Sequence, residues 1–301
     1  MEPSTRLNTV AAYKQLIRLV QVLPSSIAHP LIQIVASLNL SLRSGHPAVQ
    51  AIFANQWVLH QGNISPQALS QLVRDTFANR LRAQYDFYHH FNNPEKLAEM
   101  VVFTSSVQAL IDRTRSRETG IVLVGPHLGN FDLLGWALAQ HIPGMQVITI
   151  ANPPASYRAE NELRRRAGLD ITPASFDALA KASERLKTGG VVVTANDRPV
   201  EDFKSALTFC GNPARLPTVH IRLALKAHAP IYVAAAFRQA NQYHLEASNP
   251  IWPEPQKDHD QEIISNAERV LEVTAALIRK APQQWYMFYP IWPEALPLAP
   301  H

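Results

Sequence analysis

Apolar residues follow two different spacings along the chain, and the change falls at Gly120. Before Gly120 they recur every three or four positions, which is the spacing of amphipathic helices. Ser65 followed by Pro66 is typical of a helix N-cap and first turn, and Pro94 begins a second helical stretch that continues to Leu110. These patterns predict that the first third of the chain is helical.

Beyond Gly120, short continuous apolar runs alternate with helical segments. The runs are typical of strands buried on both faces of a sheet, and they cover residues 121–124, 146–151, 191–194 and 231–237, with a shorter extended piece at Ile171. Helices are expected at residues 131–140, 156–167, 176–188, 218–227 and 261–280, and residues 243–247 alternate like a hairpin partner. The alternation predicts an α/β fold with a mostly parallel central sheet flanked by helices, preceded by a helical N-terminal region.

These elements are expected to form a single domain over residues 1–301. Residues 1–115 would be its helical N-terminal part and residues 116–301 its α/β core. In open α/β sheets, ligands bind beyond the carboxyl ends of the strands. The segments in which we expect a site are therefore residues 125–132, Asn152 and residues 196–198.

Residues 19–42 carry no charged side chain. Their length invites a membrane-spanning interpretation, but Pro24, Pro30 and several polar residues interrupt them, so we do not expect a span. We expect a break between Pro24 and Pro30, followed by a short helix. One face of that helix would be apolar, with Leu31, Ile34, Val35, Leu38 and Leu42. The simpler interpretation is that this face packs against the core, and the alternative is that it lies on a membrane surface.

The composition excludes several functional classes. A net charge of +4 and a pI of about 9.2 are mildly basic. A nucleic-acid-binding protein would show a denser stripe of Lys and Arg with interleaved aromatic residues, so we expect no nucleic-acid partner. Cys210 is the only cysteine, which rules out an intrachain disulfide, and no Cys/His spacing indicates a metal site.

The segment Gly-Pro-His-Leu-Gly-Asn-Phe-Asp at residues 125–132 contains His127 and Asp132, separated by four residues. A neutral imidazole at a strand end can accept a proton from an alcohol, as a general base does near neutral pH. The next helix, for which Asn130 is the expected N-cap, offers unpaired N–H groups to a developing oxyanion. The spacing also fits a structural role, in which Asp132 complements the helix dipole and His127 is an ordinary loop histidine.

Six segments, in order, resemble one family. Residues 125–132 resemble the His-x4-Asp/Glu block of glycerolipid-type acyltransferases, especially the branch with the bacterial late acyltransferases of lipid A biosynthesis and the phosphatidylinositol mannoside acyltransferases. The other five are an arginine-bearing helix at 157–168, a strand with an acid–arginine pair at 191–198, Phe-x-Gly-x-x-x-Arg-x-Pro at 209–217, Ala-Pro-Ile at 229–231, and Pro-x-x-Trp at 282–285 with Trp292. Each is weak alone, but their order over most of the chain is specific.

This resemblance implies roles for individual residues. His127 matches the catalytic general base, and Asp197 matches the acidic residue that pairs with it in the mannoside branch, where a carboxylate fixes the tautomer and stabilises the imidazolium. Asp132 matches the motif carboxylate, with Arg164 as its expected ion-pair partner. Glu201 is a second and less favoured candidate to orient His127.

The resemblance also implies a substrate-binding set. Arg198 and Arg215 match basic positions that can hold phosphates of the donor or the acceptor. Arg164, Asn130 and Asn152 complete this expected set. The arginines of residues 158–166 form either a solvated helix face or a surface for phosphates and lipid headgroups.

The chain departs from the family pattern at three positions. Pro199 stands where the family often has a second acid, Asn212 where some members have Glu, and Asn152 where the mannoside branch has an acidic residue. These departures concern the acceptor pocket more than the chemistry of His127.

The implied activity is that of an O-acyltransferase. It would move a fatty acyl group from acyl-CoA or acyl carrier protein to a hydroxyl of a membrane glycolipid or phospholipid. No metal, further cofactor or covalent acyl-enzyme is expected, and Cys210 is not at a nucleophile position. Two alternatives stay open: a thioesterase- or esterase-like hydrolase, although the Gly-x-Ser-x-Gly motif is absent, and a non-catalytic lipid-binding member of the same fold.

The implied location is the cytoplasmic face of the cell (inner) membrane, with peripheral or monotopic attachment. The acceptor would reside in the bilayer while the donor is soluble. The apolar face within residues 31–42 would supply contact area, and the arginine-bearing helix would attract an anionic membrane surface by about 1 kcal/mol per basic residue.

Overall fold

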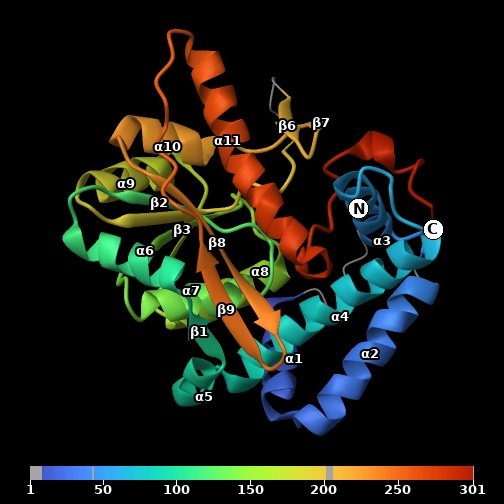
Figure 1. Ribbon diagram of the computed structural model, residues 1–301. Helices are drawn as coiled ribbons and strands as arrows, with labels where there is room; N and C mark the ends of the chain where they lie inside the picture. Colours follow the sequence, from blue (N-terminus) through green and yellow to red (C-terminus); the bar gives the residue numbers. More distant parts are fainter. Residues whose placement is uncertain (1–8, 43, 201–205, 301) are drawn as a thin grey trace.

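The computed structural model describes residues 9–42, 44–200 and 206–300 (Figure 1). The chain begins with the helices α1 (Val10–Val22), α2 (Ser25–Leu42), α3 (Pro47–Leu59) and α4 (Pro66–His90). Helices α1, α2 and α3 each pack against α4, and Figure 1 shows α2 and α4 side by side. The long helix α4 therefore connects this helical layer to the rest of the protein.

Seven of the described strands form one sheet, in the order β1-β9-β8-β2-β5-β3-β4. Their bounds are β1 (Val101–Phe103), β2 (Ile121–Val124), β3 (Gln146–Thr149), β4 (Asp170–Pro173), β5 (Val191–Thr194), β8 (Ile231–Gln239) and β9 (Gln242–Ala247). Neighbouring strands are parallel except in the β8–β9 hairpin. The predicted mostly parallel sheet is confirmed, and β6 (Leu207–Phe209) and β7 (Asn212–Ala214) form a separate antiparallel pair.

Helices cover both faces of the sheet. One face packs against α3, α9 (Phe176–Lys187), α10 (Val219–Ala227) and α11 (His259–Lys280), and the other against α6 (Ser105–Ser116), α7 (Phe131–Ala139) and α8 (Ala155–Arg166). In β2, Val122 and Val124 enter the first core while Ile121 and Leu123 enter the second. All four side chains are buried, which explains the continuous apolar run. Two short 3₁₀ turns, η1 (Pro282–Gln284) and η2 (Pro293–Ala295), follow α11.

The predicted helix from Pro94 to Leu110 is wrong. The chain instead forms α5 (Pro94–Glu99), then β1 at the sheet edge, then α6. Residues 101–103 are β-branched or aromatic, so they suit a strand beside β9 better than a helix interior. The N–H and hydroxyl of Thr104 then donate to the Leu245 carbonyl, which ends the strand pairing.

The predicted break between Pro24 and Pro30 is also wrong. Helix α2 begins directly after Pro24 and continues through Pro30. The Pro24 carbonyl accepts hydrogen bonds from the N–H groups of Ile27 and Ala28. Pro30 lies in the second turn, where its missing N–H forfeits a single intrahelical hydrogen bond near an end that already lacks several.

Helices α1 and α2 expose apolar side chains. On α2, the exposed fractions of Leu31, Ile34, Leu38 and Leu42 are 46%, 55%, 48% and 77%. The interpretation of this face as core-facing is therefore wrong. Together with Leu16, Leu19, Val22 and Ile27, these residues form what we call the apolar α1–α2 surface. Among the described residues, no helix combines the length and the hydropathy that a membrane crossing requires.

Candidate active site

His127 and Asp197 meet beyond the ends of two paired strands. In the parallel β2–β5 pair, Val124 lies opposite Thr194, and each of the two site residues follows three positions later. His127 Nδ1 lies 2.8 Å from Asp197 Oδ1, and the main-chain N–H of His127 donates to Oδ2 at 2.8 Å. The equal offset from paired strand ends is what brings together residues 70 positions apart.

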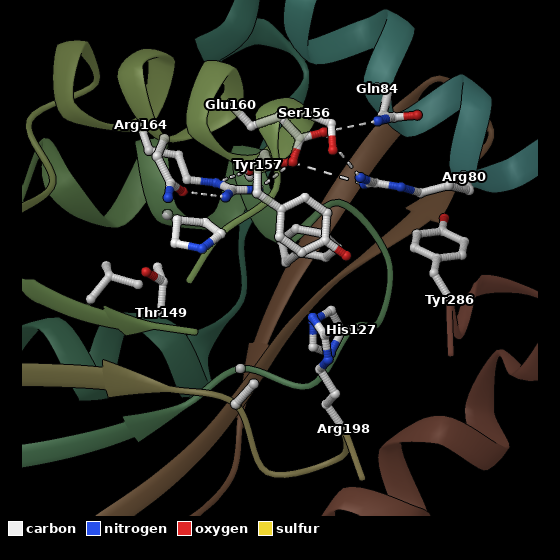
Figure 2. A pocket seen from close by; sticks show the side chains of 18 of the residues that line it. Arg80, Gln84, His127, Thr149, Ser156, Tyr157, Glu160, Arg164, Arg198 and Tyr286 are labelled. Atoms are coloured by element: carbon white, nitrogen blue, oxygen red, sulfur yellow. Dashed lines mark hydrogen bonds and ion pairs between the residues drawn. The ribbon is translucent and has the colours of Figure 1, made fainter. Parts of the chain in front are cut away.

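Asp197 is fully buried and accepts a third hydrogen bond, from Trp285 Nε1 to Oδ2 at 3.0 Å. Burial by itself raises the pKa of Asp197. The charge of His127 and the hydrogen bonds from His127 and Trp285 outweigh this effect, so the pKa lies below its ordinary value. An ionised carboxylate beside Nδ1 keeps the imidazole proton on that nitrogen. Nε2 is then free to accept a proton. The His127 side chain lines the cavity (Figure 2).

The loop that carries His127 is fixed by the C-terminal segment and by β8. The N–H of Tyr286 donates to the His127 carbonyl at 2.7 Å, and Gly129 N–H donates to the Gln284 carbonyl at 2.8 Å. Gly129 has a φ of 62°, and a Cβ at this position would lie 1.9 Å from the carbonyl oxygen of Ala236. Glycine is therefore required for the loop to approach β8 this closely.

Asp132 faces two arginines. Arg164 Nε donates to Asp132 Oδ1 at 2.7 Å, as expected, and Arg80 Nη1 lies 3.9 Å from Oδ2. Glu160 lies between the same arginines, 3.3 Å from Arg164 and 3.6 Å from Arg80 (Figure 2). The Tyr88 hydroxyl also donates to Glu160, at 2.9 Å. Arg80, Asp132, Glu160 and Arg164 thus form a neutral four-charge cluster, in which mutual pairing offsets the cost of burial.

A cavity of about 950 Å³ lies beside His127 and the four-charge cluster. Most of its wall is apolar, with side chains from α7 and the sheet and others from α1, α2 and α4. Figure 2 shows Tyr157, Arg198 and Tyr286 around the histidine. A large apolar cavity with a few polar groups at one place suits a ligand that has both hydrocarbon and polar parts.

Arg198 contributes a positive charge to the same cavity. Its guanidinium carbon lies 4.1 Å from the centre of the Tyr289 ring and 5.8 Å from that of Tyr157. Stacking on the two rings orients the planar guanidinium, which can then bind an anionic group by paired hydrogen bonds.

Three other residues predicted to bind substrate, Asn130, Asn152 and Arg215, do not line the cavity. Asn130 is buried and holds the start of α7, since Oδ1 accepts a hydrogen bond from the N–H of Leu133 and Nδ2 donates to the carbonyl of Ala83. Asn152 and Arg215 are exposed and do not line the cavity.

In the arginine-bearing helix α8, Arg164 points inward, whereas three arginines are exposed: Arg158, Arg165 and Arg166. Glu201 lies outside the described residues. Within the described ranges, no three His, Cys, Asp or Glu side chains gather closely enough to hold a metal ion.

Three residues of this site were not predicted from the sequence. Glu160 lies one helical turn before Arg164, so an i, i+4 pairing could have indicated it. Trp285 belongs to the recognised Pro-x-x-Trp segment, but nothing local indicates Asp197 as its partner. Arg80 has no local signal, because its contacts to α7 and α8 depend on how α4 packs.

Comparison with known proteins points to one family. The sequence model of a family described as bacterial lipid A biosynthesis acyltransferase matches residues 4–294. The phosphatidylinositol mannoside acyltransferase of Mycolicibacterium smegmatis is 24% identical over 180 residues, which cover 58% of this chain and 57% of that protein. The protein of the same name from Mycobacterium tuberculosis H37Rv is 24% identical over 190 residues, or 60% and 57% of the two chains. Each match spans less than two thirds of the relative's length.

Proposed function

Because the chain belongs to the bacterial lipid A biosynthesis acyltransferase family, we propose that it transfers a fatty acyl group from a thioester donor to a hydroxyl of a membrane lipid or glycolipid, with His127 as general base. The observation that carries this proposal is the 2.8 Å contact between His127 and the buried Asp197, at the wall of a large apolar cavity. The names of the mycobacterial relatives support a glycolipid acceptor.

In the proposed reaction, the acceptor hydroxyl gives its proton to Nε2 of His127 while its oxygen attacks the thioester carbonyl. A carbon–oxygen bond forms, and the carbonyl oxygen becomes an oxyanion. When this intermediate collapses, the carbon–sulfur bond breaks and the leaving thiolate takes the proton from His127. Asp197 stabilises the imidazolium between the two proton transfers. The cycle ends with an ester, a free thiol and neutral His127.

Arg198 and the four-charge cluster have separate roles in this proposal. Arg198, stacked on Tyr289, presents its charge to a phosphate of the donor, acyl-CoA or acyl carrier protein, or of the acceptor. Both carboxylate oxygens of Asp132 face arginines. Asp132 therefore acts as a positioning residue that holds the start of α7 next to His127.

The proposed location is the cytoplasmic face of the inner membrane, with peripheral attachment. The apolar α1–α2 surface supports this location, because exposed large apolar side chains concentrated on two helices indicate an interaction site. Leu16 and Leu31 belong to this surface and also line the cavity. A lipid in the bilayer would therefore reach the cavity without leaving apolar surroundings. The exposed Arg165 and Arg166 supply attraction to anionic headgroups.

The test is to incubate the protein with acyl-CoA or acyl carrier protein, with and without bacterial membrane lipids, and to analyse all products by mass spectrometry. The proposal predicts an acylated lipid and an equal amount of free thiol only when the acceptor is present. Equal release of free fatty acid with and without lipid would instead identify a hydrolase. Lipid binding with no turnover of either donor would identify a non-catalytic lipid-binding protein.

A further inference from the structure

Strand β8 is longer than its neighbour β2, so one of its edges has no partner strand near the site. The two strands pair only as far as Val233, while β8 continues to Gln239. Along a strand, alternate residues turn their main-chain groups to the same side. Ala236 and Arg238 therefore present main-chain groups beyond the end of β2, and such groups need hydrogen-bond partners where water is excluded.

The loop that carries His127 and the C-terminal segment together fill this edge of β8. Asn130 N–H donates to the Ala236 carbonyl at 2.9 Å. Two residues further along the strand, the carboxamide of Gln284 pairs with both main-chain groups of Arg238. Its Oε1 accepts from the N–H at 2.9 Å, and its Nε2 donates to the carbonyl at 3.1 Å. The buried side chain of Gln284 thus bonds to β8 as a peptide group of a further strand would.

Gln284 also holds the histidine loop directly. Its main-chain carbonyl accepts a hydrogen bond from the N–H of Gly129 at 2.8 Å. The loop, β8 and Gln284 therefore form a closed set of hydrogen bonds, in which each of the three is bonded to the other two. A shift of the loop away from β8 would break at least one of these bonds. Because Gly129 lies two residues after His127, the carboxamide of Gln284 bears on where the imidazole lies.

The preceding residue, Gln283, is a matched comparison. Its main-chain carbonyl accepts a hydrogen bond from Asn79 Nδ2 at 3.1 Å, but its own carboxamide makes no hydrogen bond to any residue that the structure describes. Its side chain is only partly buried. The two glutamines are adjacent in one segment, and only the side chain of Gln284 is bonded to β8.

We propose that Gln284 is a positioning residue for the general base: through its hydrogen bonds to Arg238 and Gly129, it fixes where His127 lies at the wall of the cavity. This inference rests on the proposed acyltransferase function and adds to it a residue that acts through the histidine loop. Proton transfer depends strongly on such placement, because a displacement of about 1 Å can cost about 10²-fold in rate.

The first experiment compares kcat and KM of Gln284→Leu and Gln283→Leu, with an acyl-CoA donor and a lipid acceptor. Leucine is close to glutamine in size but makes no hydrogen bond. In Gln284→Leu, kcat should fall about 10- to 100-fold while KM for the donor changes less than about twofold. Gln283→Leu should keep the wild-type values. Urea denaturation gives the folded fraction of each variant, and rates are calculated per folded molecule.

Gln284→Glu gives a readout that a purely structural role would not change. An ionised carboxylate can accept from the N–H of Arg238 but cannot donate to its carbonyl, whereas the protonated acid does both. Burial raises the pKa of a carboxyl group. The ratio of the variant's kcat to that of the wild type should therefore rise as the pH falls from about 9 to about 6. A ratio that stays constant or falls would contradict the inference.

More than about half of the wild-type kcat in Gln284→Leu, or an equal loss in Gln283→Leu, would overturn the inference. If the wild type transfers no acyl group, the proposed function fails separately. NMR then decides the positioning role. The Nδ1 proton of His127, assigned by its absence in His127→Ala, should change its chemical shift in Gln284→Leu and keep it in Gln283→Leu. An unchanged shift in Gln284→Leu would overturn the inference.

Discussion

Asp197 accepts two hydrogen bonds from His127 and one from Trp285. At the scale of the single residue, these contacts determine its protonation, because burial alone would favour the neutral acid. Each donor stabilises the ionised form, and the ionised form in turn stabilises a protonated His127. Removing the indole donor should therefore be visible in the pH dependence of the reaction.

We expect Trp285→Phe to shift the acidic limb of the pH–rate profile to higher pH. The variant loses one hydrogen bond to a charged group, worth about 1.5–3 kcal/mol, and keeps most of the ring packing. The pKa of Asp197 then rises, so its ionised form is lost sooner as the pH falls. Trp292→Phe is the matched control, since Trp292 is also buried and its N–H has no hydrogen-bond partner among the described residues. An identical limb in both variants would argue against this role of Trp285.

We expect Asp132→Ala to lower the free energy of unfolding by about 3–5 kcal/mol, because it leaves the two arginines Arg164 and Arg80 with only the Glu160 carboxylate to balance their charges. Urea denaturation measures the change. Asp177→Ala is the control, since Asp177 also lies in the first turn of a helix but is exposed. Its loss should cost about 0.3–1 kcal/mol, the value of a helix-dipole contact. Equal effects of the two substitutions would contradict a structural role of the four-charge cluster.

At the scale of elements, we predict that helix α2 contacts the membrane. Ile34→Glu with Leu38→Glu should abolish most binding to liposomes, because both side chains belong to the apolar α1–α2 surface. Gln33→Glu with Ser37→Glu adds the same charge to exposed polar positions of the same helix and should bind nearly as well. Flotation with anionic and neutral liposomes, at low and high salt, measures the difference. Equal flotation of both variants would exclude α2 as the contact.

Most elements could be predicted from spacing because a buried strand or an amphipathic helix has a local pattern. The strand at 121–124 and the helix at 176–188 agree with β2 and α9 to within one residue. The exceptions depend on tertiary context. Strand β1 forms because β9 is available beside it, and Pro30 is tolerated because α2 begins nearby. The exposed face of α2 could not be assigned either, since an apolar stripe looks the same whether it faces a core or a membrane.

At the scale of the whole molecule, the site depends on contacts between distant parts of the chain. His127 could be singled out from its own segment, and Asp197 from the family resemblance, but their contact needs the pairing of β2 with β5. The Trp285–Asp197 hydrogen bond spans 88 positions, and Arg80 approaches Asp132 only because α4 lies beside α8, where Tyr88 also contacts Glu160. No local pattern encodes such contacts. Arg215 and Asn152 were expected to bind substrate because of their positions in the family pattern, but neither side chain lines the cavity.

The central claim is that His127 is the base for acyl transfer, and the most direct measurement is kcat/KM of His127→Ala with a lipid acceptor and an acyl-CoA donor. The account predicts a loss of about 10²–10⁴-fold, the usual contribution of a general base. The variant should still fold, as circular dichroism would show, because Asp197 keeps the hydrogen bonds from the main-chain N–H of residue 127 and from Trp285. His141→Ala, at an exposed histidine that does not line this cavity, should retain full activity. If His127→Ala retained more than about half of the wild-type rate, the mechanism would be contradicted, because no general-base effect is that small.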